Sequence, residues 1–182
     1  MSMAPLYLMR HGEPLLAGRM LGRTDCDVTA EGIARCRDQA RGLEVRHLLS
    51  SDLLRARRCA EAIGAAGIDP RWRELDFGAW DGLAPAEIDP VALGAFWQDP
   101  DAFPPPEGEC WSALVARVRM ALADLPDDDP TLIVTHGGAM RAALHILCGL
   151  DLKAIWAFDL PYGAVLAFHR WKGGAQIAGL WP

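Results

Sequence analysis

The sequence lacks the marks of several large protein classes. Its 182 residues include five cysteines but no C-x-x-C pair, which argues against a structural zinc site. No apolar run approaches the roughly 18 residues that a membrane-spanning helix needs, and there is no repeat or low-complexity segment. The net charge of −6 argues against a nucleic-acid surface and against an anionic-membrane patch. An anionic ligand would therefore need a local basic pocket.

The composition is that of one globular domain. Of the residues, 51% are apolar and 23% are charged, so we expect residues 1–182 to form a single domain. The first residues show neither the basic nor the apolar region of a secretion signal, and the odd number of cysteines fits free thiols in a reducing compartment. We therefore expect a cytoplasmic protein. The sequence leaves open whether the chain forms a homodimer.

Strand-like and helix-like patterns alternate along the chain. The expected strands are residues 6–9, 47–50, 71–74, 131–134, 164–168 and 176–180. The expected helices are a first that follows an N-cap at Thr29 and runs to about residue 43, a second that Ser51 and Asp52 cap and that runs to about residue 66, and two more at 111–125 and 139–147. This alternation predicts an α/β three-layer sandwich, with a mostly parallel central sheet and helices on both faces.

The segment between the third strand and the third long helix is less regular. It contains two short helical patterns, at 85–88 and 91–97, and then three consecutive prolines at 104–106. Because the elements on either side belong to one expected sheet, we interpret residues 83–108 as an insertion within the domain. We predict that this insertion is a lid.

Two of the expected strands end on histidine followed by glycine. The run R-H-G-E at residues 10–13 follows the first strand, and T-H-G-G at residues 135–138 follows the fourth. Open α/β sheets bind ligands at the carboxyl ends of their strands, and glycine lets the backbone turn sharply beside a ligand. Two histidines presented in this way, one of them next to an arginine, indicate a site for a transferable phosphoryl group.

Phosphoryl transfer to an imidazole requires a neutral histidine and fixed positive charge around the phosphoryl oxygens. Arg10 offers a planar fork of donors and lowers the pKa of His11. Arg55, one turn into the second helix, and His136 are expected to add further donors. The backbone at Gly137 opens a helix, whose N-terminus favours an anion.

The reaction also requires an acid for the leaving oxygen. The bare sequence does not distinguish Glu74 from Glu13 or Asp81 in this role. A metal site built from the two histidines and an acid is an alternative interpretation, but the nearby arginines would repel a cation. We therefore expect catalysis without a metal.

Five motifs, in order along the chain, resemble those of the histidine phosphatase superfamily, also called the phosphoglycerate-mutase-like family. They are M-R-H-G-E at 9–13, D-C-D-V-T-A-E-G at 25–32, S-S-D-L-L-R-A-R-R-C-A at 50–60, E-L-D-F-G-A-W-D-G at 74–82 and V-T-H-G-G at 134–138. Each motif alone is weak, but together they are specific and span almost the whole chain.

The resemblance implies a phosphoglycerate-mutase-like fold and a role for each site residue. It implies that His11 is the phosphorylated nucleophile and that Glu74 gives a proton to the leaving oxygen. It implies that the residues binding the phosphoryl group are Arg10, Arg55 and His136, the last also catalytic, beside the backbone of Gly137. It implies no cofactor, and it makes a small phosphorylated metabolite the expected partner.

The chain departs from the family pattern at four positions. Pro14 stands where the family usually has threonine, and Leu16 stands near a position where many members have asparagine. Both positions often line the substrate side, so contacts there stay open. Cys59 replaces a helix threonine and Asp81 replaces a common glutamate. The expected phosphate-pocket positions are unchanged.

Finer patterns favour the short metabolite phosphatases of the family. The runs P-E-G-E-C at 106–110 and W-A-F-D-L-P-Y-G-A at 156–164 resemble those of α-ribazole phosphatases. We therefore expect a phosphomonoester hydrolase, with α-ribazole 5′-phosphate as a candidate substrate. A phosphoglycerate mutase or other phosphoryl-transfer mutase, and a non-catalytic phosphate-binding module, are the alternatives. Trp97, Trp111 and Trp156 suit an aromatic lid over a heterocycle and suit core packing equally well.

Overall fold

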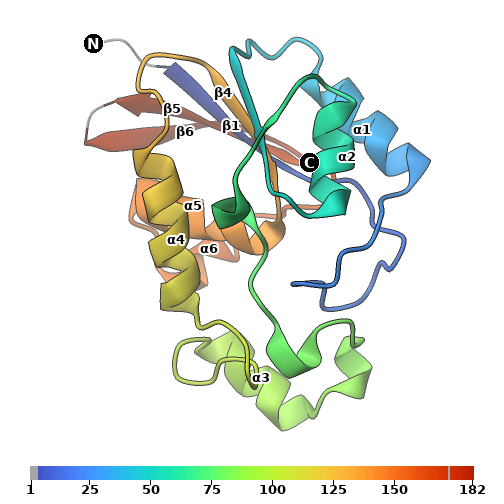
Figure 1. Ribbon diagram of the computed structural model, residues 1–182. Helices are drawn as coiled ribbons and strands as arrows, with labels where there is room; N and C mark the ends of the chain where they lie inside the picture. Colours follow the sequence, from blue (N-terminus) through green and yellow to red (C-terminus); the bar gives the residue numbers. More distant parts are fainter. Residues whose placement is uncertain (1–3, 172) are drawn as a thin grey trace.

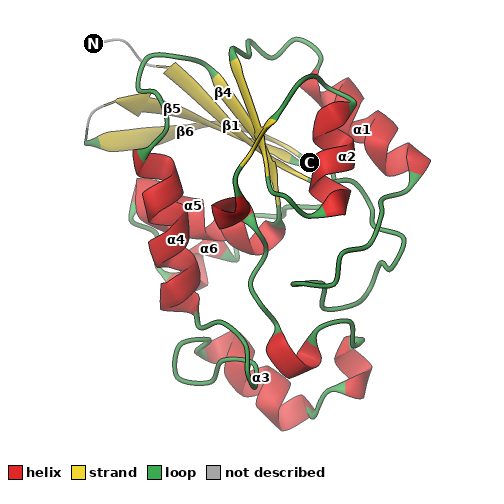
Figure 2. Ribbon diagram, viewed as in Figure 1, coloured by secondary structure: helices red, strands yellow, loops and turns green. Residues whose placement is uncertain are grey.

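The computed structural model describes residues 4–171 and 173–182, which form a six-stranded sheet with helices on both faces (Figures 1 and 2). Its strands are β1 (Ala4–Arg10), β2 (His47–Ser50), β3 (Gly67–Ile68), β4 (Thr131–Thr135), β5 (Val165–Trp171) and β6 (Gly174–Trp181). Their order is β3-β2-β4-β1-β5-β6. The first four in this order are parallel, whereas β5 runs antiparallel to β1 and β6 antiparallel to β5. The predicted fold class is confirmed.

The α-helices fall into two layers and a projecting segment. They are α1 (Ala30–Ala40), α2 (Leu54–Glu61), α3 (Pro90–Gln98), α4 (Trp111–Ala123), α5 (Gly137–Cys148) and α6 (Leu152–Ile155). The α1–α2 pair covers one face of the sheet and the α4–α5 pair covers the other. Short 3-10 helices lie at Pro70–Trp72, Gly78–Trp80 and Pro85–Glu87.

Side-chain alternation along the central strands supplies both halves of the core. In β4, Ile133 packs with the α4–α5 layer, while its neighbours Leu132 and Val134 pack with the α1–α2 layer. All five residues of β4 are buried, as expected for a central parallel strand. Each buried leucine, isoleucine or valine side chain contributes about 1.5–3 kcal/mol to folding by leaving water. The central strands β1 and β4 therefore hold the residues that follow them in fixed positions.

The pairing of β1 with β4 brings the two histidine motifs together. The strands are parallel, with Met9 opposite Val134 and Arg10 opposite Thr135. The backbone N–H of His11 also donates to the carbonyl of Thr135, at 2.9 Å. His11 and His136 therefore leave the same edge of the sheet from neighbouring strands.

The predicted third strand, residues 71–74, is wrong. The strand is instead the short β3, where Leu49 of β2 pairs with Gly67. The following residues turn because Pro70 fixes a helical φ and the Asp69 carboxylate accepts from the backbone N–H of Arg71. The resulting 3-10 turn buries Trp72 in the core rather than extending the sheet.

The predicted capping of the second helix by Ser51 and Asp52 is also wrong. The N-cap of α2 is Leu53, which makes no side-chain cap bond. The first helical N–H, that of Leu54, donates to the Asp25 carboxylate from a distant loop at 2.6 Å. Asp52 instead pairs with Arg73. The helix ends at Glu61, before the predicted residue 66. The expected cap at Thr29 is confirmed, because its hydroxyl accepts from the N–H of Gly32.

Residues 83–108 project from the sheet and its helices, at the bottom of Figures 1 and 2. Phe96 of α3 anchors this segment, since it is buried and its ring lies 5.7 Å from that of Trp80 and 6.3 Å from that of Phe77. The segment thus packs on the rest of the domain through aromatic contacts. That it acts as a lid stays a prediction.

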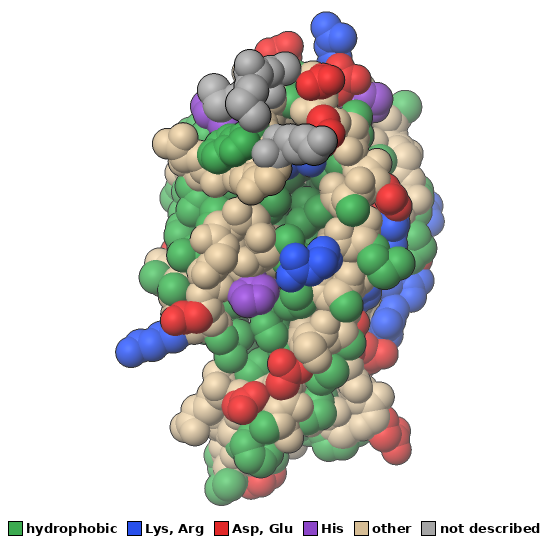
Figure 3. All heavy atoms as spheres, turned by 90° about the vertical axis from the view of Figure 1, so that its left-hand side faces the viewer, with side chains coloured by type: hydrophobic (Ala, Val, Ile, Leu, Met, Phe, Trp, Pro, Cys, Tyr) green, Lys and Arg blue, Asp and Glu red, His purple; other side chains and the backbone are tan. Residues whose placement is uncertain are grey.

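The surface shown in Figure 3 carries scattered charges with wide apolar and uncharged areas between them. Acidic and basic side chains are mixed on this face and form no single basic patch. Among the described residues, no helix combines the length and the apolar character that crossing a membrane requires.

Candidate active site

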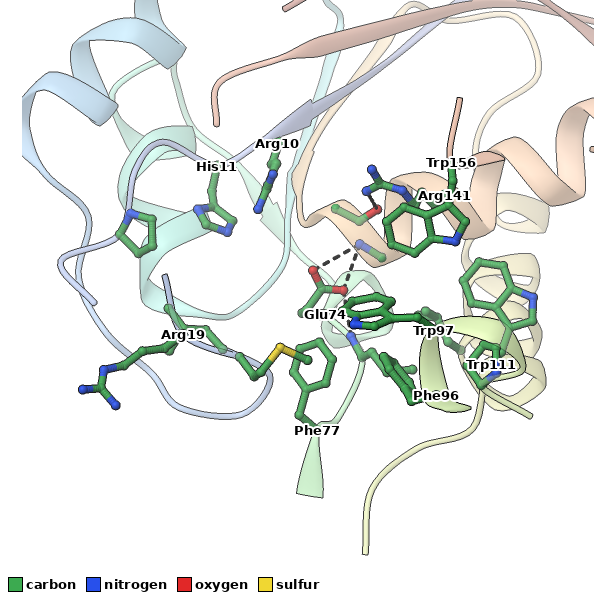
Figure 4. A pocket seen from close by; sticks show the side chains of 18 of the residues that line it. Arg10, His11, Arg19, Glu74, Phe77, Phe96, Trp97, Trp111, Arg141 and Trp156 are labelled. Atoms are coloured by element: carbon green, nitrogen blue, oxygen red, sulfur yellow. Dashed lines mark hydrogen bonds between the residues drawn. The ribbon is translucent and has the colours of Figure 1, made fainter. Parts of the chain in front are cut away.

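A cavity of about 300 Å³ lies beside the carboxyl ends of β1 and β4. Arg10, His11 and Gly137 reach it from the strand ends, and Glu74 and Tyr162 reach it from loops. An aromatic wall completes it opposite the histidine, as Figure 4 shows; its members are Phe77, Phe96, Trp97, Trp111 and Trp156. One end of the cavity is therefore polar and the other is aromatic.

His11 is held as a neutral, oriented imidazole. Its Nδ1 lies 2.7 Å from the carbonyl oxygen of Gly12, so Nδ1 carries the proton and donates it. Burial lowers the pKa of His11 well below its usual value, and the positive charges of Arg55 and Arg10 lower it further. Nε2 then keeps its lone pair at neutral pH. The expected arginine effect on this histidine is confirmed, although burial is the larger cause.

His136 lies next to His11, with 5.0 Å between the ring centroids. It is the N-cap of α5 and is completely buried. Its Nε2 hydrogen-bonds with the Ser51 hydroxyl at 2.9 Å, while Nδ1 has no partner in the described part of the chain. Burial lowers its pKa well below the usual value, and the charge of Arg55 adds to this effect. A second neutral imidazole with one free nitrogen therefore stands beside the first.

Two arginines supply the positive charge near these histidines, and both are fixed by backbone carbonyls. Arg10 donates to the carbonyl of Leu160 at 2.6 Å, and its guanidinium carbon lies 4.2 Å from the ring centre of Tyr162. Arg55 is fully buried and donates to the carbonyls of Leu21 and Thr24 at 2.7 and 2.9 Å. The Nε atoms of both arginines are buried without a protein partner among the described residues. These two unsatisfied donors suit the oxygens of an anion, and the unpartnered Nδ1 of His136 adds a third donor when Nε2 accepts from the Ser51 hydroxyl.

The structure separates the three candidate acids. Glu74 lines the cavity, whereas Glu13 is exposed to solvent. The Asp81 carboxylate accepts hydrogen bonds from the Thr24 hydroxyl and from the backbone N–H groups of Gly22 and Thr24, at 2.6 to 2.8 Å. Asp81 thus stabilises the loop around residues 22–24. Of the three candidates, Glu74 is the one that can contact a ligand in the cavity.

The two glycines at the start of α5 lie close to charged side chains. The Glu74 carboxylate accepts from the backbone N–H of Gly138 at 2.9 and 3.1 Å, and a Cβ on Gly138 would lie 2.1 Å from Glu74 Oε1. A Cβ on Gly137 would lie 3.6 Å from Arg10 Nε and 3.3 Å from Arg141 Nη1. The second glycine therefore positions Glu74, and the first leaves the cavity open beside two guanidinium groups.

Sequence reasoning missed Arg141 and gave Tyr162 no role. Arg141 lines the cavity from α5, four residues after Gly137 and thus on the same side of the helix. This spacing is the signal that could have found it. Tyr162 lies with its ring centre 5.5 Å from that of His11. The three tryptophans, for which packing and lining were equally expected, all line the cavity.

The departures from the family pattern fall on different sides of the site. Pro14 lines the cavity, whereas Leu16 is exposed and does not. The thiol of Cys59 accepts from the backbone N–H of Gly12 at 3.2 Å, so cysteine supports the loop that carries the nucleophile candidate. Within residues 4–171 and 173–182, no three histidine, cysteine or acidic side chains gather in a way that could hold a metal ion.

Comparison with protein families gives one match that covers nearly the whole chain. Residues 6–181 match the model of the histidine phosphatase superfamily (branch 1). The chain belongs to this superfamily. It is 33% identical over 177 residues to the "Probable phosphoglycerate mutase GpmB" of Erwinia tasmaniensis, a match that covers 84% of this chain and 78% of that protein.

Solved structures of the superfamily share the fold at nearly full length. TTHB049 from Thermus thermophilus is 37% identical, with a TM-score of 0.81 and coverage of 98% of this chain and 99% of that one. A "putative alpha-ribazole-5'-P phosphatase" from Escherichia coli is 25% identical, with a TM-score of 0.85 and coverage of 98% and 96%. A mycobacterial glucosyl-3-phosphoglycerate phosphatase is 25% identical, with a TM-score of 0.83 and coverage of 97% of each chain. These findings make the chain a phosphatase enzyme of this superfamily.

Proposed function

We propose that the protein hydrolyses a small phosphomonoester through a phosphohistidine on His11. The observation that carries this proposal is the state of His11. The imidazole is neutral at physiological pH because burial and two arginines lower its pKa, and Nδ1 is occupied by the Gly12 carbonyl. A neutral imidazole with a free Nε2 lone pair is a competent nucleophile toward phosphorus.

In the first step, Nε2 of His11 attacks phosphorus and the P–O bond to the leaving alcohol breaks. Arg10, Arg55 and His136 hold the non-bridging oxygens with the donors that lack a protein partner. The backbone at Gly137 lets these oxygens approach the start of α5. Glu74, as a neutral carboxylic acid next to the anionic phosphoryl group, gives its proton to the leaving oxygen.

In the second step, water attacks the phosphohistidine. Glu74, now a carboxylate, takes a proton from that water, and the P–N bond to His11 breaks. Inorganic phosphate leaves and the neutral imidazole is restored, so protons and charge balance over the cycle. No cofactor or metal takes part in this scheme, since the arginines and His136 supply the stabilisation of charge.

The substrate we propose is a small phosphorylated metabolite with a leaving group that fits the aromatic end of the cavity. Two candidates follow from similarity. One is α-ribazole 5′-phosphate, by likeness to the Escherichia coli structure, and its heterocycle suits the tryptophans. The other is an ester of the phosphoglycerate type, by likeness to the mycobacterial phosphatase. The two differ in whether the leaving group carries an acid.

A mutase is the second candidate function, favoured by the 33% identity to GpmB. A mutase would hand the phosphoryl group on His11 back to a substrate hydroxyl rather than to water. It would need a bisphosphate primer to load His11. A binding module without catalysis is disfavoured, because His11, Arg10 and Glu74 line one cavity and His136 lies next to His11, although Arg55 and His136 do not themselves line that cavity.

The test is to assay the purified enzyme on a panel of phosphorylated metabolites, with and without 2,3-bisphosphoglycerate. Hydrolysis predicts inorganic phosphate without primer and no isomerised phosphoglycerate. Isomerised product that requires primer would establish the mutase instead. His11→Ala is the control for contaminating phosphatase, and release by that variant equal to wild type would contradict the proposal. We also propose a cytoplasmic location, which cell fractionation would test.

A further inference from the structure

Arg141 is a guanidinium in the cavity that the proposed reaction does not use. It lies on α5 and lines the cavity beyond Glu74 as seen from His11 (Figure 4). Its guanidinium carbon lies 4.2 Å from the ring centre of Trp156. The ring of Trp97 from the predicted lid in turn meets Trp156 edge-on, with 5.2 Å between centroids. Arg141 therefore reaches from the start of α5, beside Gly137, to the aromatic end of the cavity, where a leaving group would lie.

The hydrogen-bonding capacity of Arg141 is largely unused. Its two bonds, to the carbonyls of Gly137 and Phe158, are both at the long limit of 3.4 Å. Its buried Nε has no partner, and no carboxylate in the described part of the chain forms an ion pair with it. Glu74 and Asp159 are close enough to act on its pKa, but burial dominates and lowers that pKa.

Arg117 shows what a structural arginine in the same region looks like. It donates to both carboxylate oxygens of Glu109 at 2.7 and 2.9 Å and to the carbonyls of Arg71, Arg73 and Glu74 at 2.7 to 2.8 Å. All of its nitrogens are satisfied. Arg141 is part-buried like Arg117, but its two hydrogen bonds, both of 3.4 Å, are longer and fewer than the five of Arg117. A desolvated cation with free donors is costly unless a ligand satisfies it.

We infer that Arg141 binds a second anionic group, carried by the leaving group of the substrate. The guanidinium of Arg141 lies over the Trp156 ring, and its fork of donors suits a carboxylate or a phosphate. This inference rests on the proposed hydrolase and makes it specific: the preferred substrates are acidic phosphomonoesters. Arg141 is then a specificity-determining residue, whereas Arg10 and Arg55 serve every phosphomonoester.

The test compares esters that differ in one acidic group. 3-Phosphoglycerate and glycerol 3-phosphate differ in a carboxylate, and fructose 1,6-bisphosphate and fructose 6-phosphate differ in a second phosphate. We expect wild type to prefer the acidic member of at least one pair, and the pair identifies the anion. In Arg141→Gln that preference in kcat/KM should fall on the order of 10- to 100-fold, the usual worth of charge-assisted hydrogen bonds. Arg141→Lys should restore part of it.

Arg119→Gln, an exposed charge removal on α4, is the matched control and should keep the wild-type preference. The inference is overturned if wild type shows no preference within either pair, or if Arg141→Gln lowers both members equally, as a residue that merely positions Glu74 would. It is also overturned if α-ribazole 5′-phosphate, whose leaving alcohol has no acidic group, exceeds every acidic ester.

Binding separates failure of this inference from failure of the proposed function. In the His11→Ala background, calorimetry measures the affinity for each ester without turnover. If wild type hydrolyses nothing but the acidic esters still bind tighter in a manner that needs Arg141, the subsite stands and the hydrolase does not. If wild type hydrolyses all esters and Arg141 has no differential effect, the hydrolase stands and the subsite is wrong.

Discussion

The two ends of the cavity are built in opposite ways. At the phosphoryl end, His11 and His136 leave adjacent buried strands, and Arg55 is fully buried and held by backbone carbonyls. At the leaving-group end, Trp97 and Trp156 are each 44% exposed and come from the predicted lid and a late loop. Glu74 stands between the two ends (Figure 4).

This difference separates the chemistry from the choice of substrate. Backbone pairing and close packing fix the phosphoryl end, so its geometry tolerates little change. Loops and half-exposed rings make the other end, where substitutions cost less stability. One scaffold can therefore keep a single reaction while the leaving group varies. Four substitutions or treatments probe this division.

The largest loss of activity is expected in Glu74→Gln, since Glu74 lies between the two ends of the cavity. Glutamine keeps an acceptor for the N–H of Gly138 but has no proton to give. We expect kcat on an alkyl phosphate to fall on the order of 10²–10⁴-fold. On p-nitrophenyl phosphate the loss should be much smaller, because nitrophenolate leaves without protonation. The exposed Glu13→Gln is the control. Equal losses on both substrates would mean that Glu74 shapes the pocket and does not act as the acid.

The second expected effect is a pH dependence of the free energy of unfolding, caused by His11 and His136 at the phosphoryl end. His11 and His136 have folded-state pKa values well below 6.5, so below about pH 6.5 the unfolded chain binds protons that the folded protein does not. The free energy of unfolding should therefore fall as pH decreases from about 7.5 to about 5.5, by up to about 1.4 kcal/mol per pH unit for each histidine. Urea unfolding at several pH values measures this slope.

The control for that slope is the exposed His169→Gln, which should leave it unchanged. The double variant His11→Gln, His136→Gln should flatten it, since neither buried imidazole is then present to resist protonation. A wild-type slope in the double variant would show that other groups set the acid sensitivity and that the two imidazoles are not held neutral by burial.

The third effect belongs to the leaving-group end. Trp97→Ala removes the edge-on contact with Trp156 and opens the aromatic wall. An aromatic pair contributes about 0.5–1.5 kcal/mol, so KM for a bulky ester should rise roughly 2- to 10-fold, and KM for methyl phosphate should stay close to wild type. Trp181→Ala, equally exposed on the edge strand β6, is the control. An equal rise in KM for both esters would show that Trp97 stabilises the fold and does not contact the leaving group.

The smallest effect is expected from a chelator. Because the proposed reaction takes its stabilisation of charge from Arg10, Arg55 and His136, EDTA should change activity by less than about twofold. The measurement is the initial rate after dialysis against the chelator. A loss that magnesium or another divalent ion restores would show that the phosphoryl end is incomplete without a metal.

The sequence predicted the phosphoryl end far better than the rest. Strand–histidine–glycine runs are local signals, and adjacent parallel strands bring their ends together, so His11 and His136 could be paired without coordinates. The choice of Glu74 over Asp81 came from family resemblance. In the structure the Asp81 carboxylate accepts hydrogen bonds from Thr24 and Gly22, whereas Glu74 lines the cavity, and the role of Glu74 as the acid stays a prediction.

The errors lie where distant contacts override local patterns. Asp25, from another loop, caps α2 in place of the adjacent Ser51 and Asp52. At residues 70–72 the local signals were misinterpreted: Pro70 and the Asp69 cap start a 3-10 turn, and Trp72 enters the core from it, although the alternation there resembles a strand. The four-residue spacing from Gly137 places Arg141 on the cavity side of α5, but its partners Trp156 and the Phe158 carbonyl come from a distant loop and could not be predicted from that spacing.

The central claim is that the phosphoryl group passes through His11. Rapid quenching of wild-type enzyme during turnover of p-nitrophenyl phosphate, followed by peptide mapping, tests it most directly. The account predicts phosphate on His11 that is labile to acid and stable to base, and none in His11→Ala, which should retain inorganic phosphate binding through Arg55 and His136. Phosphate on another residue, or turnover with no phosphoenzyme at any quench time, would contradict it.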